Sequence, residues 1–563
     1  MLSKLKRSSL PVTALLTLLI FTFIIGCAKK EESPTKTESL LLKRGGIFRD
    51  SVLSSVTGFD PVKTIDVATL RLGQQIYQCL VEIDENLTIV PLLAESWETP
   101  DNKIWTFHIR KGVKFHDDPA FTGNKGREIT AHDIKYSFER LLNPGAKTVG
   151  SWIFNDIVNG AKEYFDGKVK EVAGFKVIDD YTFRIELVKP FYPLLTRLSL
   201  YLCSIVPREG IEKYGEEYGQ HPIGTGPFIL TKLVPDQEIV LSKNTHYWEK
   251  DVDGNQLPYL DGVKIKFIRE EMIQFKEFEA GNLDVSDIPT AMYPSIVDES
   301  RMLHGKYSGY QLKTAPAIEV QYYVFILAEK TFVTNKSLRQ AFNYAIDKES
   351  IVRNVLKGRA IVAKGVIPHG LLAYNPDLKG YSYSIEAAKE KLKEAGYPDG
   401  QGLPEFKLVI DTGVLTEAVA TAIQSQLLQV GVRAKIEITQ FNTLLEMAAK
   451  GKASIFRLWF AASYPEPELF FIQFLSGYWP PLGFNFARYT NPKFDDVFSK
   501  ATQAISESER IKYYREAEQI VVDDAPWIFL YHPEAAKILQ PYMRNYQFNG
   551  LQLSKYKYIW IDK

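Results

Sequence analysis

Few residues in this sequence have the types and spacing that enzyme chemistry requires. Ser554 and Lys557 match a Ser-x-x-Lys motif, in which the lysine can activate the serine as a nucleophile. The accompanying Ser-Asp-Asn and Lys-Thr-Gly motifs do not occur in the sequence, and a match at two fixed positions is close to chance. His116, Asp117 and Asp118 could ligate a metal, but their polar, glycine-rich loop favours solvated charge. The eight histidines are scattered along the sequence, so we predict no metal and no cofactor.

The other common catalytic motifs are also missing from the sequence. It contains no HExxH, no CxxC, no GxxxxGK followed by Ser or Thr, and no GxSxG. Enzymes that use a pair of carboxylates, such as glycosidases, leave little trace in sequence, so a hydrolase of the cell envelope stays an alternative. The residues therefore predict a protein that is not an enzyme.

One cysteine stands where covalent modification is expected. Three cations within the first seven residues precede an uncharged, mostly apolar run at 15–25, which is typical of an export signal. Ile24-Ile25-Gly26-Cys27 resembles the lipobox of bacterial lipoproteins, in which the cysteine thiol is lipidated and becomes the first residue of the mature chain. The alternative is an uncleaved membrane anchor, because the run approaches the ~20 residues that span a bilayer. Both readings place the body of the protein outside the cytoplasm.

Two further cysteines leave their redox state open. Cys79 and Cys203 both stand among apolar residues. An extracytoplasmic location permits a disulfide between them, and buried free thiols are equally compatible with their surroundings.

Length and composition indicate a large, multidomain globular protein. The 563 residues suggest three or four domains at ~150 residues each. Sixty-eight basic and 68 acidic residues cancel, so nothing indicates nucleic acid as a partner. The aromatic excess suits walls for a peptide or sugar ligand, although most of the rings are expected in the core. Residues 29–43 are charged and lack any helical or strand period, so they are expected to form a disordered tether.

The sequence predicts both strands and helices that could position a site. Residues 105–110 alternate apolar and polar side chains, which is typical of a half-buried strand. Thr130 and Asp133 have the spacing of a capping box at the start of a helix. Further on, the order strand 406–410, helix 416–429 and strand 434–438 predicts a parallel βαβ unit.

Several stretches together resemble the family 5 extracellular solute-binding proteins, which are dipeptide- and oligopeptide-binding lipoproteins of ABC importers. The matching stretches keep their order and lie at 92–97, 105–117, 130–133, 223–228, 338–347 and 464–467. They extend the resemblance over essentially the whole mature chain.

This resemblance implies an α/β fold of the periplasmic-binding-protein type (class II, the three-subdomain peptide-binding kind), with a hinge that closes two lobes over a ligand. The implied segments are a signal peptide at 1–26, a lipid-anchored tether at 27–43, the first lobe at 44–86, 206–315 and 525–563, an extra subdomain of that lobe at 87–205, and the second lobe at 316–524.

The chain departs from the family at two places. The loop at 118–128 is longer than the turn usual there. Peptide binders of the family carry Ala-Asp-Tyr where this chain has Ala462-Ser463-Tyr464, and their aspartate meets the α-ammonium group of the ligand. Ser463 carries no charge, so another carboxylate must replace the aspartate if the ligand has a free amine. The candidates for this role are Glu466, Glu468 and Asp66.

We predict a ligand pocket built from both lobes. The predicted pocket residues are Arg457, Trp459, Phe460, Ala461, Ser463 and Tyr464 in the second lobe, with Asp66 and Val67 opposite them. Arg457 would offer a fork of donors to a carboxylate. Trp459 or Phe460 would form an apolar wall.

The predicted function is capture of a peptide or peptide-like solute outside the cytoplasmic membrane and its delivery to an ABC transporter. The predicted partners are the solute, the permease and ATPase complex, and a membrane reached through lipid on Cys27; the protein is expected to be a monomer. The alternatives are a ligand sensor, a cell-envelope hydrolase, or a binding protein for a sugar, an opine or a metal chelate.

Overall fold

A computed structural model of the chain describes residues 44–64, 66–327, 332–452, 454–481 and 483–562. The predicted signal peptide, Cys27 and the tether lie outside the described residues. Within the described part, no helix has both the length and the apolar character needed to cross a bilayer.

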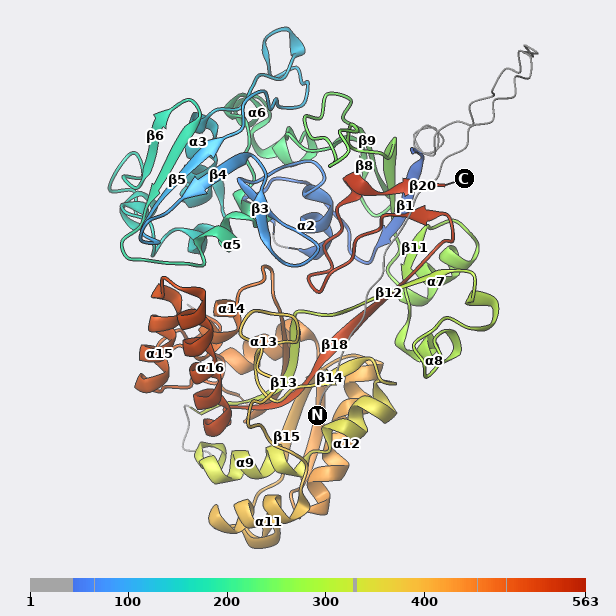
Figure 1. Cartoon of the computed structure of the whole chain (residues 1–563). Coiled ribbons are helices and arrows are strands. Elements are labelled where there is room, and N and C mark those ends of the chain that lie inside the picture. Colours follow the sequence, from blue (N-terminus) through green and yellow to red (C-terminus); the bar gives the residue numbers. More distant parts are fainter. Residues whose placement is uncertain (1–43, 65, 328–331, 453, 482, 563) are drawn as a thin grey trace, which may run out of the picture. The chain divides into compact units, whose positions relative to one another are not determined.

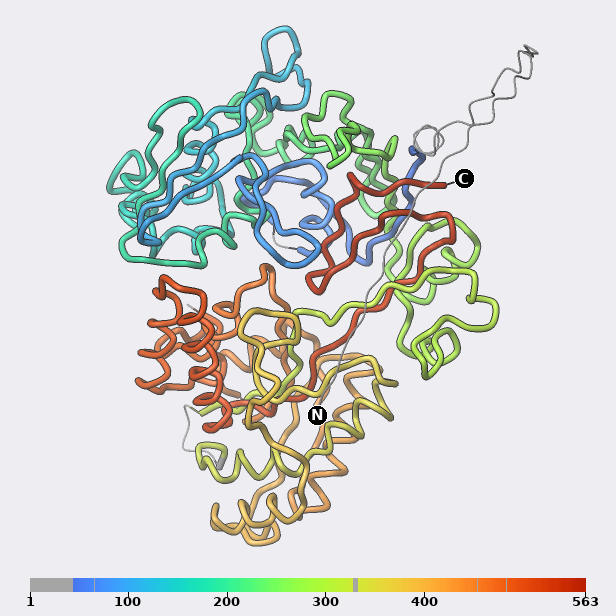
Figure 2. The backbone as a smooth tube through the Cα atoms, in the orientation of Figure 1, coloured from blue at the N-terminus to red at the C-terminus, as the bar shows by residue number. Residues whose placement is uncertain are grey.

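The first sheet joins segments that are far apart in the sequence. Its order is β1 (Ile47–Val52), β10 (Gly262–Phe267), β9 (Glu238–Lys243) and β8 (Phe228–Val234), with β1 parallel to β10 and the other pairs antiparallel. The C-terminal strand β20 (Trp560–Ile561) also contacts β1, and the backbone N–H of Ile561 donates to the carbonyl of Gly45. Figure 2 shows the blue start and the red end of the described chain side by side there.

A second, antiparallel sheet carries the predicted half-buried strand. Its order is β4 (Ala94–Glu98), β5 (Ile104–Ile109), β7 (Thr182–Glu186) and β6 (Phe175–Asp179). The helix α3 (Ala131–Leu142) packs on β6 and β7. It begins where the sequence predicts: the Oδ2 atom of Asp133 accepts from the backbone N–H of Thr130 at 2.9 Å.

The largest sheet has the order β11 (Val285–Asp287), β18 (Trp527–Leu539), β13 (Glu319–Phe325), β17 (Ile455–Ala461), β15 (Phe406–Asp411) and β16 (Ala434–Thr439). The strands β12 (Gln311–Pro316) and β14 (Ala360–Val362) also pair with β18. The strand β15, helix α12 (Val414–Gln429) and strand β16 form the predicted parallel βαβ unit. Figure 1 shows β18 running without interruption from β13 to β11 and β12.

Helices cover both faces of this sheet and close two cores. One face packs against α9 (Lys336–Ala345), α11 (Ile385–Glu394) and α12; the other packs against α13 (Phe441–Ala449), α15 (Pro492–Gln503) and α16 (Glu507–Asp524). The remaining α-helices and strands of the described chain are α2 (Val67–Gly73), α4 (Ala161–Phe165), α5 (Leu194–Leu198), α6 (Arg208–Tyr214), α7 (Glu271–Glu279), α8 (Tyr293–Ile296), α10 (Lys348–Ser350), α14 (Glu468–Phe471), β2 (Val81–Ile83), β3 (Ile89–Pro91) and β19 (Met543–Arg544).

The Gly224-Thr225-Gly226-Pro227 stretch packs tightly against the backbone of Ile76. A Cβ atom on Gly224 would lie 2.0 Å from the carbonyl oxygen of Ile76, and one on Gly226 would lie 2.5 Å from the same atom. The expectation of solvated charge at His116 is wrong, because its side chain is buried and its Nε2 lies 2.9 Å from the carbonyl oxygen of Gly226. Burial lowers the pKa of His116 to about 4, which favours a neutral ring held by the backbone.

The open question about the two internal cysteines has an answer in the structure. Cys79 and Cys203 are both buried free thiols. The Sγ atom of Cys79 donates to the carbonyl of Leu200 at 3.1 Å, and burial raises the pKa of this thiol to about 12. Both cysteines therefore behave as small core residues rather than as reactive groups.

Candidate functional site

Three strands of the large sheet end at the same edge. The strands β15, β16 and β17 run parallel to one another, since β15 pairs in parallel with both β16 and β17, so their carboxyl ends, at Asp411, Thr439 and Ala461, point the same way. In open α/β sheets, ligands bind outside the carboxyl ends of such strands. This edge is therefore the first place to look for a binding site.

A chain of polar side chains runs across this part of the sheet. The Nη1 atom of Arg457 donates to Asp411 Oδ1 at 2.8 Å, and its Nη2 atom donates to Gln321 Oε1 at 2.5 Å. The Nε2 atom of Gln321 in turn donates to Glu319 Oε1. We call these four residues, Glu319, Gln321, Asp411 and Arg457, the polar row. Because Glu319 pairs with Ala461, and Gln321 with Trp459, the polar row shares one face of the sheet with Trp459.

Arg457 is therefore held in place by its own chain. Its side chain is 14% exposed and that of Asp411 is 18% exposed, so the pair lies at the border of solvent. Both ends of the guanidinium already have an acceptor, Asp411 and Gln321. A ligand carboxylate at Arg457 would share these donors or displace an acceptor. The predicted role of Arg457 as a fork for a carboxylate stays a prediction.

Glu319 is one of three members of the polar row that sequence analysis missed, together with Gln321 and Asp411. Its carboxylate receives one side-chain hydrogen bond, from Gln321, and forms no ion pair with the residues that the structure describes. Burial raises the pKa of Glu319, while Gln321 and the nearby Arg457 lower it. A partly buried carboxylate without its own cation is costly unless a positive group approaches it.

An exposed aromatic pair stands beside the polar row. Trp459 is 41% exposed and Phe441, at the start of α13, is 37% exposed; their rings stack with centroids 6.3 Å apart. Phe460 is half-buried and meets Phe470 edge-on at 5.4 Å, so it faces the core side of the strand. Ala461 is exposed. Trp459, rather than Phe460, is thus positioned to form an apolar wall.

Ser463 and Tyr464, which follow β17 closely, differ in exposure. Ser463 is exposed, and the backbone N–H of Ala462 just before it donates to the carbonyl of Ile318 at 2.8 Å. Tyr464 is fully buried and its hydroxyl donates to Glu468 Oε2 at 2.7 Å. A ligand can reach Ser463 directly, whereas Tyr464 acts through its packing.

Asp66 and Val67 lie at the start of helix α2. Asp66 caps this helix, since its Oδ1 atom accepts from the backbone N–H of Thr69 at 2.9 Å, and Val67 is 78% exposed. Among the residues described, no hydrogen bond or ion pair joins Asp66 to the β17 residues. Their predicted place opposite β17 stays a prediction.

The two candidate carboxylates after Ser463 are both buried. Glu468 accepts from Arg197 Nη2 at 2.5 Å as well as from Tyr464. Glu466 accepts from the hydroxyl of Tyr514 at 3.1 Å, and burial raises its pKa to about 7. Because Glu468 already has a cation, and Glu466 is inside the core, Glu319 is the better placed carboxylate for a ligand.

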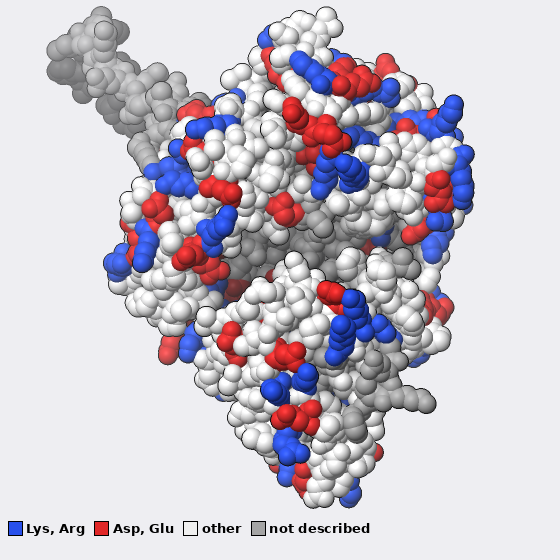
Figure 3. Space-filling model, turned by 180° about the vertical axis from the view of Figure 1, so that it is seen from behind, with Lys and Arg blue, Asp and Glu red and all other residues white. Residues whose placement is uncertain are grey.

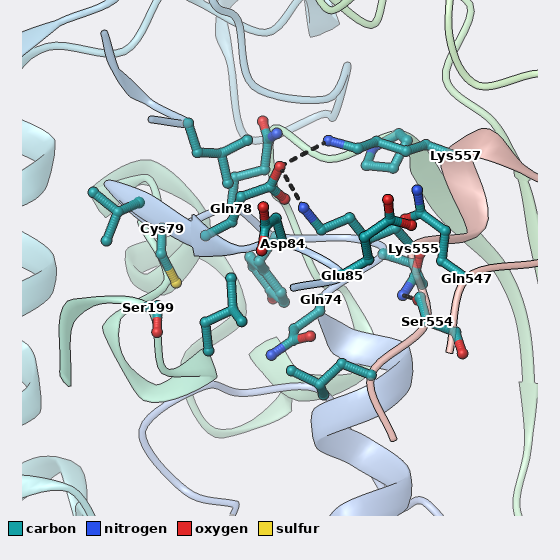
Figure 4. Close-up of a pocket in the computed structure, with 18 of the residues that line it drawn as sticks. Gln74, Gln78, Cys79, Asp84, Glu85, Ser199, Gln547, Ser554, Lys555 and Lys557 are labelled. Atoms are coloured by element: carbon teal, nitrogen blue, oxygen red, sulfur yellow. Dashed lines mark hydrogen bonds and ion pairs between the residues drawn. The ribbon is translucent and has the colours of Figure 1, made fainter. Parts of the chain in front are cut away.

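Figure 4 shows a separate internal cavity of about 70 Å³, formed by residues 74–85 and 547–557 together with neighbours. Its two lysines are paired: Lys557 Nζ lies 2.6 Å from Glu249, and both Lys555 and Lys557 contact Glu82, as the dashed lines show. This volume holds a few waters, whereas solute pockets usually measure ~300–1,000 Å³. The cavity is therefore smaller than a usual solute pocket, and we do not assign the solute to it.

Metal binding and single-sign charge do not stand out in the described part of the molecule. No group of three or more His, Cys, Asp or Glu side chains there could hold a metal ion. Lys and Arg are interspersed with Asp and Glu over the face shown in Figure 3. This surface lacks the continuous basic stripe that nucleic-acid binding uses.

The chain matches a family model and several characterised proteins. The model described as bacterial extracellular solute-binding proteins, family 5, middle region, matches residues 88–480. Heme-binding protein A of Haemophilus influenzae is 29% identical over 554 residues, covering 95% of this chain and 96% of the relative. The dipeptide-binding protein of Escherichia coli K12 is 28% identical over 524 residues, covering 90% and 93%.

Solved structures share the fold. HbpA2 from Haemophilus parasuis superimposes with a TM-score of 0.77 at 23% identity, covering 92% of this chain and 100% of that one. The periplasmic binding protein DppA from Helicobacter pylori, in complex with the peptide STSA, gives 0.76 at 24% identity, covering 94% and 100%. The predicted two-lobed α/β fold is confirmed.

Proposed function

The chain belongs to the bacterial extracellular solute-binding proteins of family 5, and from this premise we propose that it captures a peptide or peptide-like solute outside the cytoplasmic membrane and delivers it to an ABC transporter for import. Two similar proteins bear names of such ligands: the dipeptide-binding protein of E. coli K12, and the glutathione-binding protein GsiB of Salmonella typhimurium, 28% identical over 485 residues. Both ligands combine an ammonium group with carboxylates, which sets what the site must offer.

The observation that carries the proposal is the polar row beside an exposed tryptophan. Arg457 supplies a fixed positive charge, Glu319 a carboxylate without an ion pair among the described residues, and Trp459 an apolar face. A zwitterionic ligand needs one partner of each sign, and charge-assisted hydrogen bonds are roughly twice as strong as neutral ones. The indole ring of Trp459 can add a cation–π attraction for an ammonium group held over its face.

Glu319 also answers the question raised by Ser463. Position 463 carries a hydroxyl where peptide binders of the family have an aspartate, so the ammonium group needs another partner. Glu319 pairs across the strands with Ala461, two residues before Ser463. We assign the ammonium contact to Glu319, while Ser463 contributes a neutral hydrogen bond. In this role Glu319 takes the place of the three carboxylates that the sequence suggested, which were Glu466, Glu468 and Asp66.

Calorimetry with di- to pentapeptides tests this function. The mature protein is titrated with free peptides and with the same peptides N-acetylated at the amine. We expect the free peptides to bind, and acetylation or Glu319→Gln to weaken binding by about 10- to 100-fold, since a hydrogen bond to a charged group contributes roughly 1.5–3 kcal/mol. Glu390→Gln, an exposed position on α11, is the matched control and leaves affinity unchanged.

Three outcomes separate the parts of the proposal. Equal binding by the Glu319→Gln variant contradicts the role of Glu319 but leaves peptide capture standing. Restoration of tight binding in Glu319→Gln by Ser463→Asp would support a shared ammonium position. Failure of every peptide to bind contradicts the ligand class and leaves sugars, opines and metal chelates as the alternatives.

Location and anchoring complete the proposed function. The family is extracytoplasmic, and we place the lipid anchor at Cys27, with the protein acting as a monomeric binding protein rather than an enzyme. Acyl chains contribute about 0.8 kcal/mol per buried CH₂, so a multiply acylated cysteine anchors stably.

Cys27→Ser is expected to block lipidation and leave unprocessed precursor, measured by intact mass and membrane fractionation. Normal acylation and cleavage of this variant would exclude the lipoprotein assignment.

A further inference from the structure

A second cavity, distinct from the polar row, has a volume of about 500 Å³. One wall comes from the β2–β3 turn, β4, β5 and the start of α5; the other comes from the loop at 370–372, residues 465–466 and the first turns of α16. Small-molecule pockets usually measure ~300–1,000 Å³. The cavity is therefore large enough for a ligand of its own.

A buried arginine lines this cavity without hydrogen-bond acceptors. Arg510 on α16 is 2% exposed, and its guanidinium carbon lies 3.3 Å from the ring centroid of Tyr192. Neither its Nε nor its Nη1 atom has a hydrogen-bond partner among the residues described. Buried polar groups are nearly always hydrogen-bonded, so Arg510 is a cation at the cavity wall with donor capacity to spare.

The neighbouring carboxylates do not satisfy Arg510. Its Nη1 atom lies 3.7 Å from Glu466 Oε2 and its Nη2 atom lies 3.9 Å from Glu507 Oε2, and both distances exceed that of a hydrogen bond. Glu466 uses its other oxygen to accept from Tyr514, and the side chain of Glu507 is 63% exposed to water. The positive charge is thus partly balanced, while the Nε and Nη1 atoms of Arg510 have no acceptor among the described residues.

The rest of the wall suits an apolar body with one polar end. Trp97, Leu87 and Leu371 contribute apolar surface, and the Oγ1 atom of Thr99 is a further buried polar atom without a partner in the described structure. We propose that this cavity binds a small molecule with a carboxylate on an aromatic or branched apolar body, the carboxylate accepting from Arg510. Glu466 and Glu507 disfavour a doubly charged phosphate there, because like charges at this distance repel.

Such a ligand would contact both walls at once. Residues 86–105 and 192–196 form one wall, and residues 370–372, 465–466 and 507–510 form the other. Occupation of the cavity would therefore hold these two parts of the molecule together, independently of the solute at the polar row.

Calorimetry with matched probes tests the proposal on the mature protein. The probes are indole-3-acetate, its neutral analogue indole-3-acetamide, and inorganic phosphate. We expect the acid to bind at least tenfold more tightly than the amide, and Arg510→Gln to abolish this preference. Lys512→Gln, an exposed position on the same helix, is the control and keeps it. Thr99→Val is expected to weaken acid binding several-fold and serves as a second variant if Arg510→Gln does not fold.

Each contrary result overturns the proposal. Equal affinity for acid and amide, or no binding of either, would mean that the cavity holds water only. Tighter binding of phosphate than of the acid would exclude the carboxylate class. Glu319→Gln is expected to leave indole-3-acetate binding unchanged; a loss there would place the acid at the polar row instead, and would leave the proposed peptide capture untouched.

Discussion

The surroundings of Glu518, a buried glutamate, predict how the stability of the protein depends on pH. The Oε1 atom of Glu518, on α16, accepts from the backbone N–H groups of Val366 and Ile367 at 2.8 Å each, while its Oε2 atom has no partner in the described part of the chain. Burial raises the pKa of Glu518 to about 7, against the lowering effect of the two N–H donors.

Glu518→Gln is expected to stabilise the protein more at high pH than at low pH. Between pH 4.5, the ordinary value, and about 7, the unfolded state loses the proton while the folded state keeps it, so wild-type stability falls as the pH rises through this window. Glutamine keeps the acceptor and cannot ionise. The melting temperature of the variant minus that of wild type should therefore grow from pH 5 to pH 8. Glu516→Gln, exposed on the same helix, should show no such trend.

At the scale of residues, sequence analysis predicted some members of the proposed site and omitted others, and the role of each in ligand binding stays a prediction. Arg457, Trp459 and Ser463 come just before the family-like stretch at 464–467, and they lie in or directly after β17. Glu319 and Gln321 were missed because their partners are distant in sequence. The signal was present: two polar residues spaced by two in an otherwise apolar run must share one face of a strand.

Among the elements, the start of α3 offers a direct test of capping. Asp133 accepts from the backbone N–H of Thr130 and is also held by Arg127, whose Nη2 donates to Asp133 Oδ1 at 2.6 Å. Asp133→Ala removes both interactions and is expected to lower the free energy of unfolding by about 2 kcal/mol. Asp133→Asn keeps an acceptor for the cap and loses the charge, so its effect should be smaller. Urea unfolding followed by circular dichroism measures both, and wild-type stability of Asp133→Ala would contradict the capping role.

Elements with a clear period were predictable, and fully buried ones were not. The unit β15–α12–β16 and the strand β5 followed from periodicity. The strand β13 lies between β17 and β18, and six of its seven residues are buried, so no alternation of polar and apolar residues continues beyond Glu319 and Gln321. The same burial on both sides is why this central strand can hold Glu319 and Gln321 at a controlled position.

At the scale of the whole molecule, one long strand connects different parts of the largest sheet. The strand β18 pairs with β13 through its first half and with β12 and β11 through its second. Between them, the backbone N–H of Ala317 donates to the carbonyl of Pro533 at 2.9 Å. Proline cannot donate to the ladder, so pairing is locally weaker at this crossing. We expect the hinge at this point; the predicted lobe boundaries, including the one at 524, stay predictions.

Closure over a ligand is expected to depend on a buried contact outside the pocket. Arg197, on α5, forms an ion pair with Glu468 at 2.5 Å and lies over the ring of Trp152, which stacks with Tyr464 at 6.5 Å. Removing one partner of a buried pair leaves an uncompensated charge, which typically costs 3–5 kcal/mol in proteins. Arg197→Met should therefore reduce ligand affinity, whereas Arg197→Met combined with Glu468→Gln should recover part of it. Lys407→Met, which breaks an exposed pair with Glu437, is the control.

Small-angle scattering with and without peptide measures the motion itself. A ligand that binds the closed state better than the open one must shift the population towards closure, so addition of peptide should decrease the radius of gyration. The decrease should be smaller in Arg197→Met than in wild type or Lys407→Met, because Arg197 and Glu468 belong to different predicted lobes and loss of their ion pair is expected to disfavour closure. Mass spectrometry of the recovered peptide should show it chemically unchanged. An unchanged radius in wild type at saturation would contradict the hinge, and a cleaved peptide would contradict the assignment as a binding protein.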